Sequence, residues 1–245
     1  MHRLDIRKRP VSYTHLDVYK RQGCTLRSTE SAGVTQEVLG RETSMNVTFI
    51  LLGIIGVVYG LSLIHILILF TSYWLMERVF YGLKEQLSDY PLFLMGRGRL
   101  DVISSFRRSG NGVLFASDSA GEEIDLAGDI LSSLIVVKLP FSVPDPVMEY
   151  QRNQYEDFDL YRRDIIIPEM LIKLRQWFGH GIRREQDTAV FSILDSRTSL
   201  RGRYRAEILN TLPTMPVTDR LMDVEDFIIR KKTDSYFMDK ENAIA

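Results

Sequence analysis

Three polar clusters in this sequence carry residue types that bind phosphate groups or stabilise shifting charge. Thr71-Ser72-Tyr73 places hydroxyls directly after a short apolar run, and Ser117–Asp129 is rich in serine, glycine and carboxylates. The third cluster, Gln176–Arg184, combines an amide, a histidine and paired arginines. Hydroxyls accept and donate hydrogen bonds to phosphate oxygens, and guanidinium groups hold them bidentately. Each cluster alone also fits an ordinary role, as a helix cap, a turn or a solvated face.

Short apolar runs alternate with helical patterns from Leu67 onward, and this alternation predicts how the clusters are positioned. The helical patterns cover 74–87 and 168–178, with Pro168 in the first turn, where proline is favoured. Such alternation predicts an α/β fold with a parallel sheet whose ligands bind beyond the carboxyl ends of the strands. We therefore expect all three clusters at that single edge of the sheet. The strand candidates are 67–70, 91–95, 112–116, 134–138 and 189–194.

The first 66 residues differ in character from the rest of the chain. Residues 1–46 sustain neither helical nor strand periodicity, so we expect them to be disordered. Pro10–Gln22 resembles the conceptual translation of a sequencing adapter, and Leu61–Ile66 looks like a second piece of that kind. Residues 47–66 are predicted to form an apolar helix. The apolar run continues to Phe70, and by its length 47–70 could cross a membrane. A chimeric join explains this length more simply, so we expect a globular domain at 67–238, a tail at 239–245 and no membrane partner.

Composition restricts the chemistry of the chain. The formal net charge is −1, so any contact with nucleic acid must come from a local patch. Cys24 is the only cysteine, which excludes an internal disulfide and an iron–sulfur cluster held by this chain alone. The four histidines are too scattered for a metal-binding spacing, so we expect no metal site formed by this chain. A reducing, cytoplasmic location fits these observations.

The ordered series of motifs from Leu67 to Met238 resembles the C-terminal helicase domain of the DinG family, the bacterial superfamily 2 helicases related to XPD. The most specific parts are Lys138–Pro144, which reads K-L-P-F-S-V-P, and the helix ending at Gln176–Arg184, which resembles motif VI. Gly121–Asp129 is similar to motif V. The remaining matching stretches are 69–73, 92–98, 111–116, 193–197 and 212–213.

The resemblance implies a RecA-like domain that closes on ATP and Mg²⁺ held mainly by a separate N-terminal RecA-like half. Single-stranded DNA would run across both halves. An arginine of the C-terminal half then reaches the γ-phosphate during transfer. The roles carried over are catalytic for Arg183 and His180, nucleotide-binding for Gln176, Gly179, Glu122 and Asp125, and DNA-binding for Thr71, Ser72, Tyr73 and Ser119.

Two positions depart from the family pattern. Motif VI runs Q-x-x-G-R-x-x-R, and His180 stands where the first arginine is expected. A histidine is shorter and mostly neutral at pH 7, so one charge contact is lost or becomes pH-dependent. Glu123 replaces a glycine of motif V and adds a negative charge beside a phosphate path. Both changes predict a weak motor.

The 245 residues contain neither G-x-x-x-x-G-K-[ST] nor a D-E-x-H box, so we expect no ATP hydrolysis by this chain alone. The leading interpretation is the C-terminal motor half of a DNA helicase. The alternatives are a membrane-tethered interaction protein that uses residues 47–70 as an anchor, and a non-functional chimeric fragment. Another nucleotide-binding α/β enzyme is disfavoured because no glycine-rich loop lies between a strand and a helix.

Overall fold

Strand β2 (His65–Phe70) is an interior strand of a parallel sheet, and its last five residues are fully buried. It is paired on one side with β4 (Gly112–Ser117) and on the other with β5 (Ser133–Val136). The further strands are β3 (Leu92–Leu94), β6 (Ala189–Ile193), β1 (Val11–His15) and β7 (Val217–Thr218), in the order β3-β4-β2-β5-β6-β1-β7. This computed structural model describes residues 11–15, 50–51, 53–55, 65–96, 100–117, 126, 131–143, 145–182 and 187–231.

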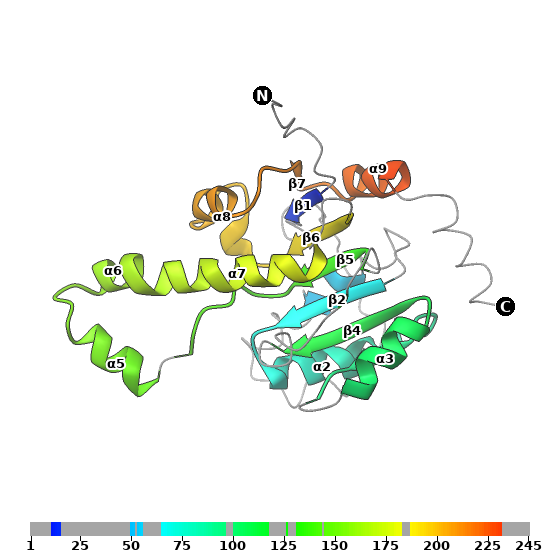
Figure 1. Ribbon diagram of the computed structural model, residues 1–245, viewed down its shortest axis with the longest axis horizontal. Helices are drawn as coiled ribbons and strands as arrows, with labels where there is room; N and C mark the ends of the chain where they lie inside the picture. The colour runs from blue at the N-terminus through cyan, green and yellow to red at the C-terminus, as the bar shows by residue number, and fades with distance from the viewer. Residues whose placement is uncertain are drawn as a thin grey trace, which may run out of the picture.

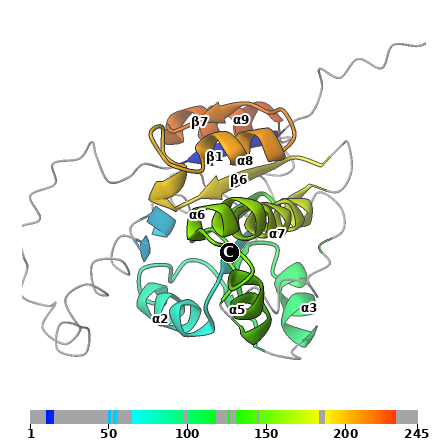
Figure 2. The same cartoon turned by 90° about the vertical axis from the view of Figure 1, so that its left-hand side faces the viewer.

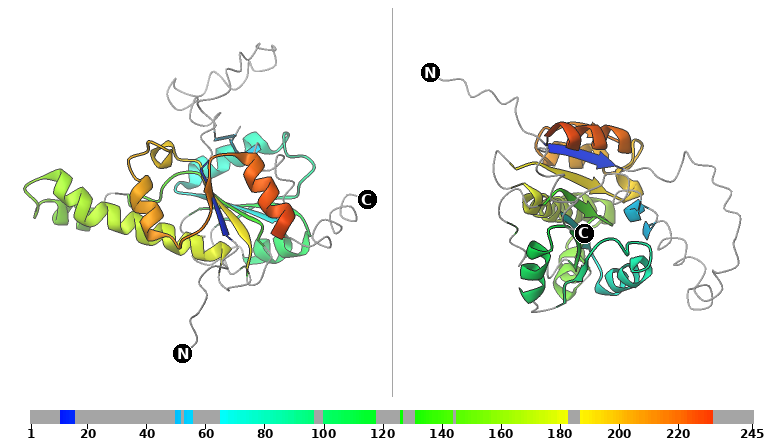
Figure 3. Two further views of the ribbon diagram at one scale, coloured as in Figure 1. Left: turned by 90° about the horizontal axis from the view of Figure 1, so that it is seen from above. Right: turned by 90° about the vertical axis from the view of Figure 1, so that its right-hand side faces the viewer.

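Helices cover both faces of the sheet and form two separate apolar cores (Figure 1). Helices α3 (Leu100–Arg108), α7 (Ile167–Gly181) and α8 (Arg205–Thr211) pack against one face. Helices α2 (Tyr73–Leu83) and α9 (Leu221–Lys231) pack against the other, and α9 lies over β1 (Figure 3). Strand side chains alternate between the two cores, as the pleat requires. The predicted parallel α/β fold is confirmed.

A helical arm projects away from the sheet on the side of α7 (Figures 1 and 2). It consists of α5 (Pro146–Arg152), α6 (Phe158–Tyr161), a π-helical turn (Arg162–Ile166) and the first half of α7. Asp145 caps α5 by accepting the Met148 N–H at 2.8 Å. The Tyr161 hydroxyl donates to the Met148 carbonyl at 3.1 Å, which ties the two short helices together.

The N-terminal expectations need two corrections. Val11–His15, expected to be disordered and adapter-like, forms β1 in register with Ala189–Ile193 of β6. Its β-branched and aromatic residues suit a strand that completes the open side of β6. Ile66, assigned to a second adapter-like piece, is fully buried in β2 and pairs with Val113 and Ser133. The domain therefore starts before Leu67.

The remaining element predictions are largely confirmed. All five strand candidates and the helices at 74–87 and 168–178 exist with shifted ends, and Pro168 lies in the first turn of α7. Residues 50–51 and 53–55 are helical, which agrees with the apolar helix expected at 47–66. His65 and Ile66 belong to strand β2 instead, and the other residues of that range lie outside the described ranges. No helix among the described residues is long and apolar enough to cross a bilayer. The expected tail at 239–245 lies outside the described ranges.

Candidate functional site

The hydroxyl cluster Thr71-Ser72-Tyr73 lies at the topological switch point of the sheet. It follows β2, and from β2 the chain continues to β3 on one side of the sheet. From the neighbouring β5 the chain continues to β6 on the other side. Parallel α/β sheets bind their ligands in the crevice outside the carboxyl ends of two such strands. The expected position of this cluster is therefore confirmed.

Ser72 is the N-cap of α2. Its backbone is extended, with φ −141° and ψ 125°, and its Oγ accepts the Leu75 N–H at 3.4 Å. The Met76 N–H donates to the Ser72 carbonyl at 3.0 Å and closes the first turn. The Ser72 side chain is nonetheless exposed, as is Tyr73 at 45%, while Thr71 is half-buried. The hydroxyl thus stabilises the helix and still faces solvent at the carboxyl edge of the sheet.

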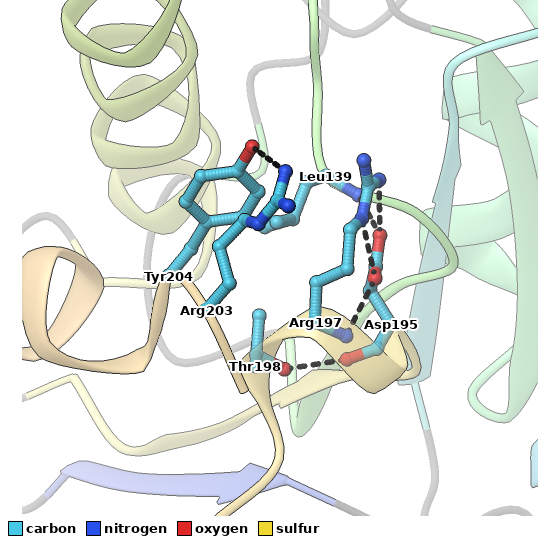
Figure 4. Close-up of polar contacts among 6 residues, drawn as sticks. All are labelled: Leu139, Asp195, Arg197, Thr198, Arg203 and Tyr204. Carbon is cyan, nitrogen blue, oxygen red and sulfur yellow. Dashed lines mark hydrogen bonds and ion pairs between the residues drawn. The ribbon is translucent and has the colours of Figure 1, made fainter. Parts of the chain in front are cut away.

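A buried carboxylate at the end of β6 connects two strands at the same edge (Figure 4). Asp195 is 8% exposed, and its Oδ2 accepts the Leu139 N–H, which follows β5, at 3.0 Å. Arg197 donates to the same carboxylate from Nε at 2.9 Å and from Nη2 at 2.6 Å. Its backbone N–H donates to Oδ1 at 3.0 Å. The carboxylate therefore fixes a guanidinium at the carboxyl edge, two strands from Ser72.

The pKa of Asp195 is held below its ordinary value by this arrangement. Burial by itself would raise the pKa, but the side-chain hydrogen bond from Arg197 and the two backbone N–H donors outweigh it. The same contact raises the pKa of Arg197. The guanidinium carbon of Arg197 lies 4.7 Å from the centre of the Phe141 ring, and the Arg197 side chain is 42% exposed. It is thus a fixed, partly solvated positive charge.

The loop after Arg197 folds back tightly on itself. Thr198 Oγ1 donates to the Asp195 carbonyl at 2.7 Å, and the Tyr204 N–H donates to the Arg197 carbonyl at 3.1 Å. A Cβ on Gly202 would lie 2.3 Å from the Arg197 carbonyl oxygen, so only glycine fits there. Sequence reasoning used residues 193–197 only as part of a resemblance and missed the anchoring role of Asp195. A carboxylate directly after a strand, two residues before an arginine, was the available signal.

The C-terminal end of α7 lies at the opposite edge from the one expected. An added Cβ on Gly181 would lie 3.7 Å from Leu134 and 3.8 Å from Ala189, and these residues are at the start of β5 and β6. A helix that connects parallel strands must run antiparallel to them, so its last turn reaches their amino ends. The prediction of one shared edge is therefore wrong for Gly179 and His180, whereas Gln176 lies about one turn earlier on α7 and lines a cleft with Ser142 and Val143, which follow β5.

Gln176 lies beside a cleft between α5 and α7 of about 550 Å³. Gln176 is exposed on α7, and Lys173 and Ile172 come from the preceding turn. Val143 and Val147 supply apolar surface from the α5 side and are 78% and 64% exposed. Around Gly179 no heavy atom comes within 4 Å of an added Cβ, so its backbone is open to approach. His180 is half-buried in the last turn of the helix.

Comparison with known proteins decides the family. The family model described as the helicase C-terminal domain matches residues 61–215. The chain belongs to this helicase family. Its relatives place this helicase domain in the DinG type: the ATP-dependent DNA helicase YoaA of Haemophilus influenzae is 34% identical over 172 residues, 67% of this chain and 26% of that protein. The ATP-dependent DNA helicase DinG of Photobacterium profundum is 33% identical over 156 residues, 60% of this chain and 22% of that protein.

The helicase domain spans about a quarter or less of the length of these relatives. One of them, named 3'-5' exonuclease DinG, from Bacillus subtilis, is 28% identical over 166 residues, 63% of this chain and 17% of that protein. The solved structures XPD_APO and XPD_Helicase superpose with TM-scores of 0.57 and 0.54, at 18% and 20% identity. Each covers 84% of this chain, with 39% and 35% of their own chains matched, and this likeness concerns the fold alone.

Part of the expected helicase machinery lies outside the described residues. Ser119, Glu122, Asp125 and Arg183 belong to that part, as does the departure at Glu123. Leu126, the one described residue of the motif V segment, is 2% exposed and shares the core of α7 with Trp177 and Phe178. At this residue, the motif V segment therefore lies on the same face of the sheet as the helix that carries Gln176.

Proposed function

We propose that this chain is the C-terminal motor lobe of an ATP-dependent DNA helicase, and that it works with an N-terminal RecA-like lobe. The observation that supports this most strongly is the match to the helicase C-terminal domain, together with exposed hydroxyls at the switch point of the sheet. In this proposal the two edges of the sheet have different tasks. Thr71, Ser72 and Tyr73 hold single-stranded DNA at the carboxyl edge, Ser119 is a further DNA contact, and the end of α7 serves the nucleotide.

The DNA task follows from the chemistry of Ser72 and its neighbours. Hydroxyls and free N–H groups at the start of a helix contact phosphate oxygens without reading sequence. The exposed Tyr73 lies one residue further along the same helix start. Binding is therefore expected to tolerate any sequence and to weaken as salt increases, because phosphate contacts release counterions.

The nucleotide task falls to α7 and the segment after it. ATP supplies the transferable phosphoryl group, and this chain contributes Gln176, Glu122 and Asp125 as polar contacts and Gly179 as an open backbone position. Arg183 and His180 stabilise negative charge on the γ-phosphate. Among the described residues no group of three His, Cys, Asp or Glu side chains comes together to hold a metal ion. Because the sequence contains no D-E-x-H box, we assign magnesium coordination to the N-terminal lobe.

DNA binding is tested by titrating the full chain into a labelled oligonucleotide at about 50 mM and about 200 mM salt. We expect a dissociation constant of roughly micromolar order at the lower salt and weaker binding at the higher salt. Two variants separate the structural role of Ser72 from its proposed DNA role. S72D keeps the cap and adds a charge that favours a helix start, so stability holds while DNA affinity falls at least about tenfold. S72A loses about 1 kcal/mol of stability instead. Equal DNA affinity for S72D and the unchanged chain would refute the DNA task.

The nucleotide task is tested with a separately purified N-terminal lobe of a DinG relative. The mixture is expected to hydrolyse ATP in the presence of DNA, and R183A should reduce the rate by about a thousandfold. Arg175 is exposed on the same helix and has no assigned role, so R175A is the matched control and should leave the rate unchanged. An unaffected rate in R183A would remove the arginine from the proposed mechanism.

A further inference from the structure

Trp74 is an unusually exposed indole for its position. It is in the first turn of α2, directly after Ser72 and Tyr73 at the switch point, and it is 52% exposed. The other tryptophan of the chain, Trp177, is 2% exposed within the core of α7. Large aromatic side chains normally bury most of their surface. An indole held in solvent beside the proposed DNA contacts therefore requires an explanation.

A cation holds this indole in place. The guanidinium carbon of Arg78 lies 4.4 Å from the centre of the Trp74 ring, one helical turn away in the i, i+4 relationship. The first turn of α2 contains no acidic residue that would repel a phosphate. Arg78 thus fixes the orientation of the indole at a helix start that a phosphate can approach.

We propose that Trp74, oriented by Arg78, is a stacking platform for one base of single-stranded nucleic acid. This inference rests on the proposed function, which assigns the neighbouring hydroxyls to phosphate groups but assigns no contact to a base. A strand whose phosphate is held at Ser72 brings its next base within reach of a side chain two residues away. The Arg78 guanidinium covers one face of the indole, and the base stacks on the surface that remains exposed.

Stacking and phosphate binding have different physical signatures. Every base has a π face, so a stacking platform adds affinity without sequence preference. Because the indole is uncharged and neutralises no phosphate, the affinity that Trp74 adds is independent of salt, unlike the affinity that phosphate contacts add. The contribution also requires that a base is present, and an abasic sugar–phosphate strand cannot use it.

The experiment compares two labelled strands of equal length, an oligothymidine and an abasic backbone, titrated into the full chain. W74A should weaken oligothymidine binding about tenfold and leave abasic binding unchanged. W74F retains an aromatic face and should recover most of the loss. Tyr150 of α5 is 68% exposed and remote in sequence, so Y150A is the matched control and should bind as the unchanged chain does. Tryptophan fluorescence of the full chain should be quenched by oligothymidine and not by the abasic strand.

The outcomes separate this inference from the proposed function. Oligothymidine binding that W74A leaves unchanged overturns the stacking platform and keeps the phosphate contacts. Equal losses for both strands overturn it as well, because they identify a general structural effect of the substitution. If neither strand binds the unchanged chain, the proposed DNA task and the platform fail together. A loss confined to oligothymidine and recovered by W74F supports the platform, provided that thermal unfolding of W74A matches that of the unchanged chain.

Discussion

Arg197 and Asp195 form a two-pronged contact at the carboxyl end of β6, with Nε to Oδ1 at 2.9 Å and Nη2 to Oδ2 at 2.6 Å. The carboxylate also accepts the Leu139 N–H from the segment after β5. Side chain and backbone donors from two strands therefore meet on one buried acid. This contact fixes the geometry of the carboxyl edge, where Ser72 and Trp74 also lie.

D195N is expected to destabilise the domain at neutral pH by about 2 kcal/mol. The asparagine retains one acceptor, but its amide donors face the guanidinium and the Leu139 N–H, leaving buried donors without partners. Because the folded-state pKa of Asp195 is depressed, its stabilisation is fully present above the unfolded value near 3.9 and is lost as pH falls through the folded value. Denaturant unfolding of both proteins from pH 7 down to about pH 3 checks this, and a difference that stays constant contradicts it.

G202A is expected to cost roughly 2 to 3 kcal/mol, because the added methyl would overlap the Arg197 carbonyl. The strain falls on the loop that returns to Tyr204, so Arg197 loses its fixed position as well. Gly179 has open space around it and provides the matched control, since G179A should change stability by less than about 1 kcal/mol. Thermal unfolding of the two variants measures the contrast, and equal midpoints would show that the loop adapts.

The stability of the domain is expected to fall as pH drops below about 6.5, and His65 is the cause. Burial lowers its pKa in the folded state, although a hydrogen bond with the Phe106 backbone opposes the shift. The unfolded chain therefore takes up the proton at a higher pH, and the loss of stability ends once pH is below the folded value. H65N should flatten this pH dependence. The quantity to measure is the difference in unfolding free energy between the two proteins at pH 5 and pH 7.5.

The sequence predicted the strands well because they are apolar on both faces. Ile66 to Phe70 and Val113 to Ala116 are almost wholly hydrophobic, which is the pattern of strands covered by helices on both sides. β7 was missed because Val217–Thr218 has only two residues and neither is buried. Among the helices, α3 was missed although Val102, Ile103 and Phe106 have helical spacing, because the stretch is short and strongly charged.

The sites were harder to predict because they depend on contacts distant in sequence. Leu139 and Asp195 are separated by 56 positions, and no local pattern predicts that the N–H of one donates to the other. Thr71–Tyr73 could be placed, because a cluster that directly follows a strand stays at the carboxyl edge. His180 was misplaced because it lies at the end of a helix, whose direction is reversed relative to the strands.

H180R is expected to strengthen the motor. His180 stands in the last turn of α7, where the family pattern has an arginine, and a permanent cation there also complements the helix dipole. In the assay with an added N-terminal lobe, we expect ATP turnover to rise at least about tenfold, less than a complete arginine finger provides, because Arg183 is already present. Turnover equal to that of the unchanged chain would show that residue 180 does not act on the phosphate. H180K tests whether a charge without bidentate geometry suffices.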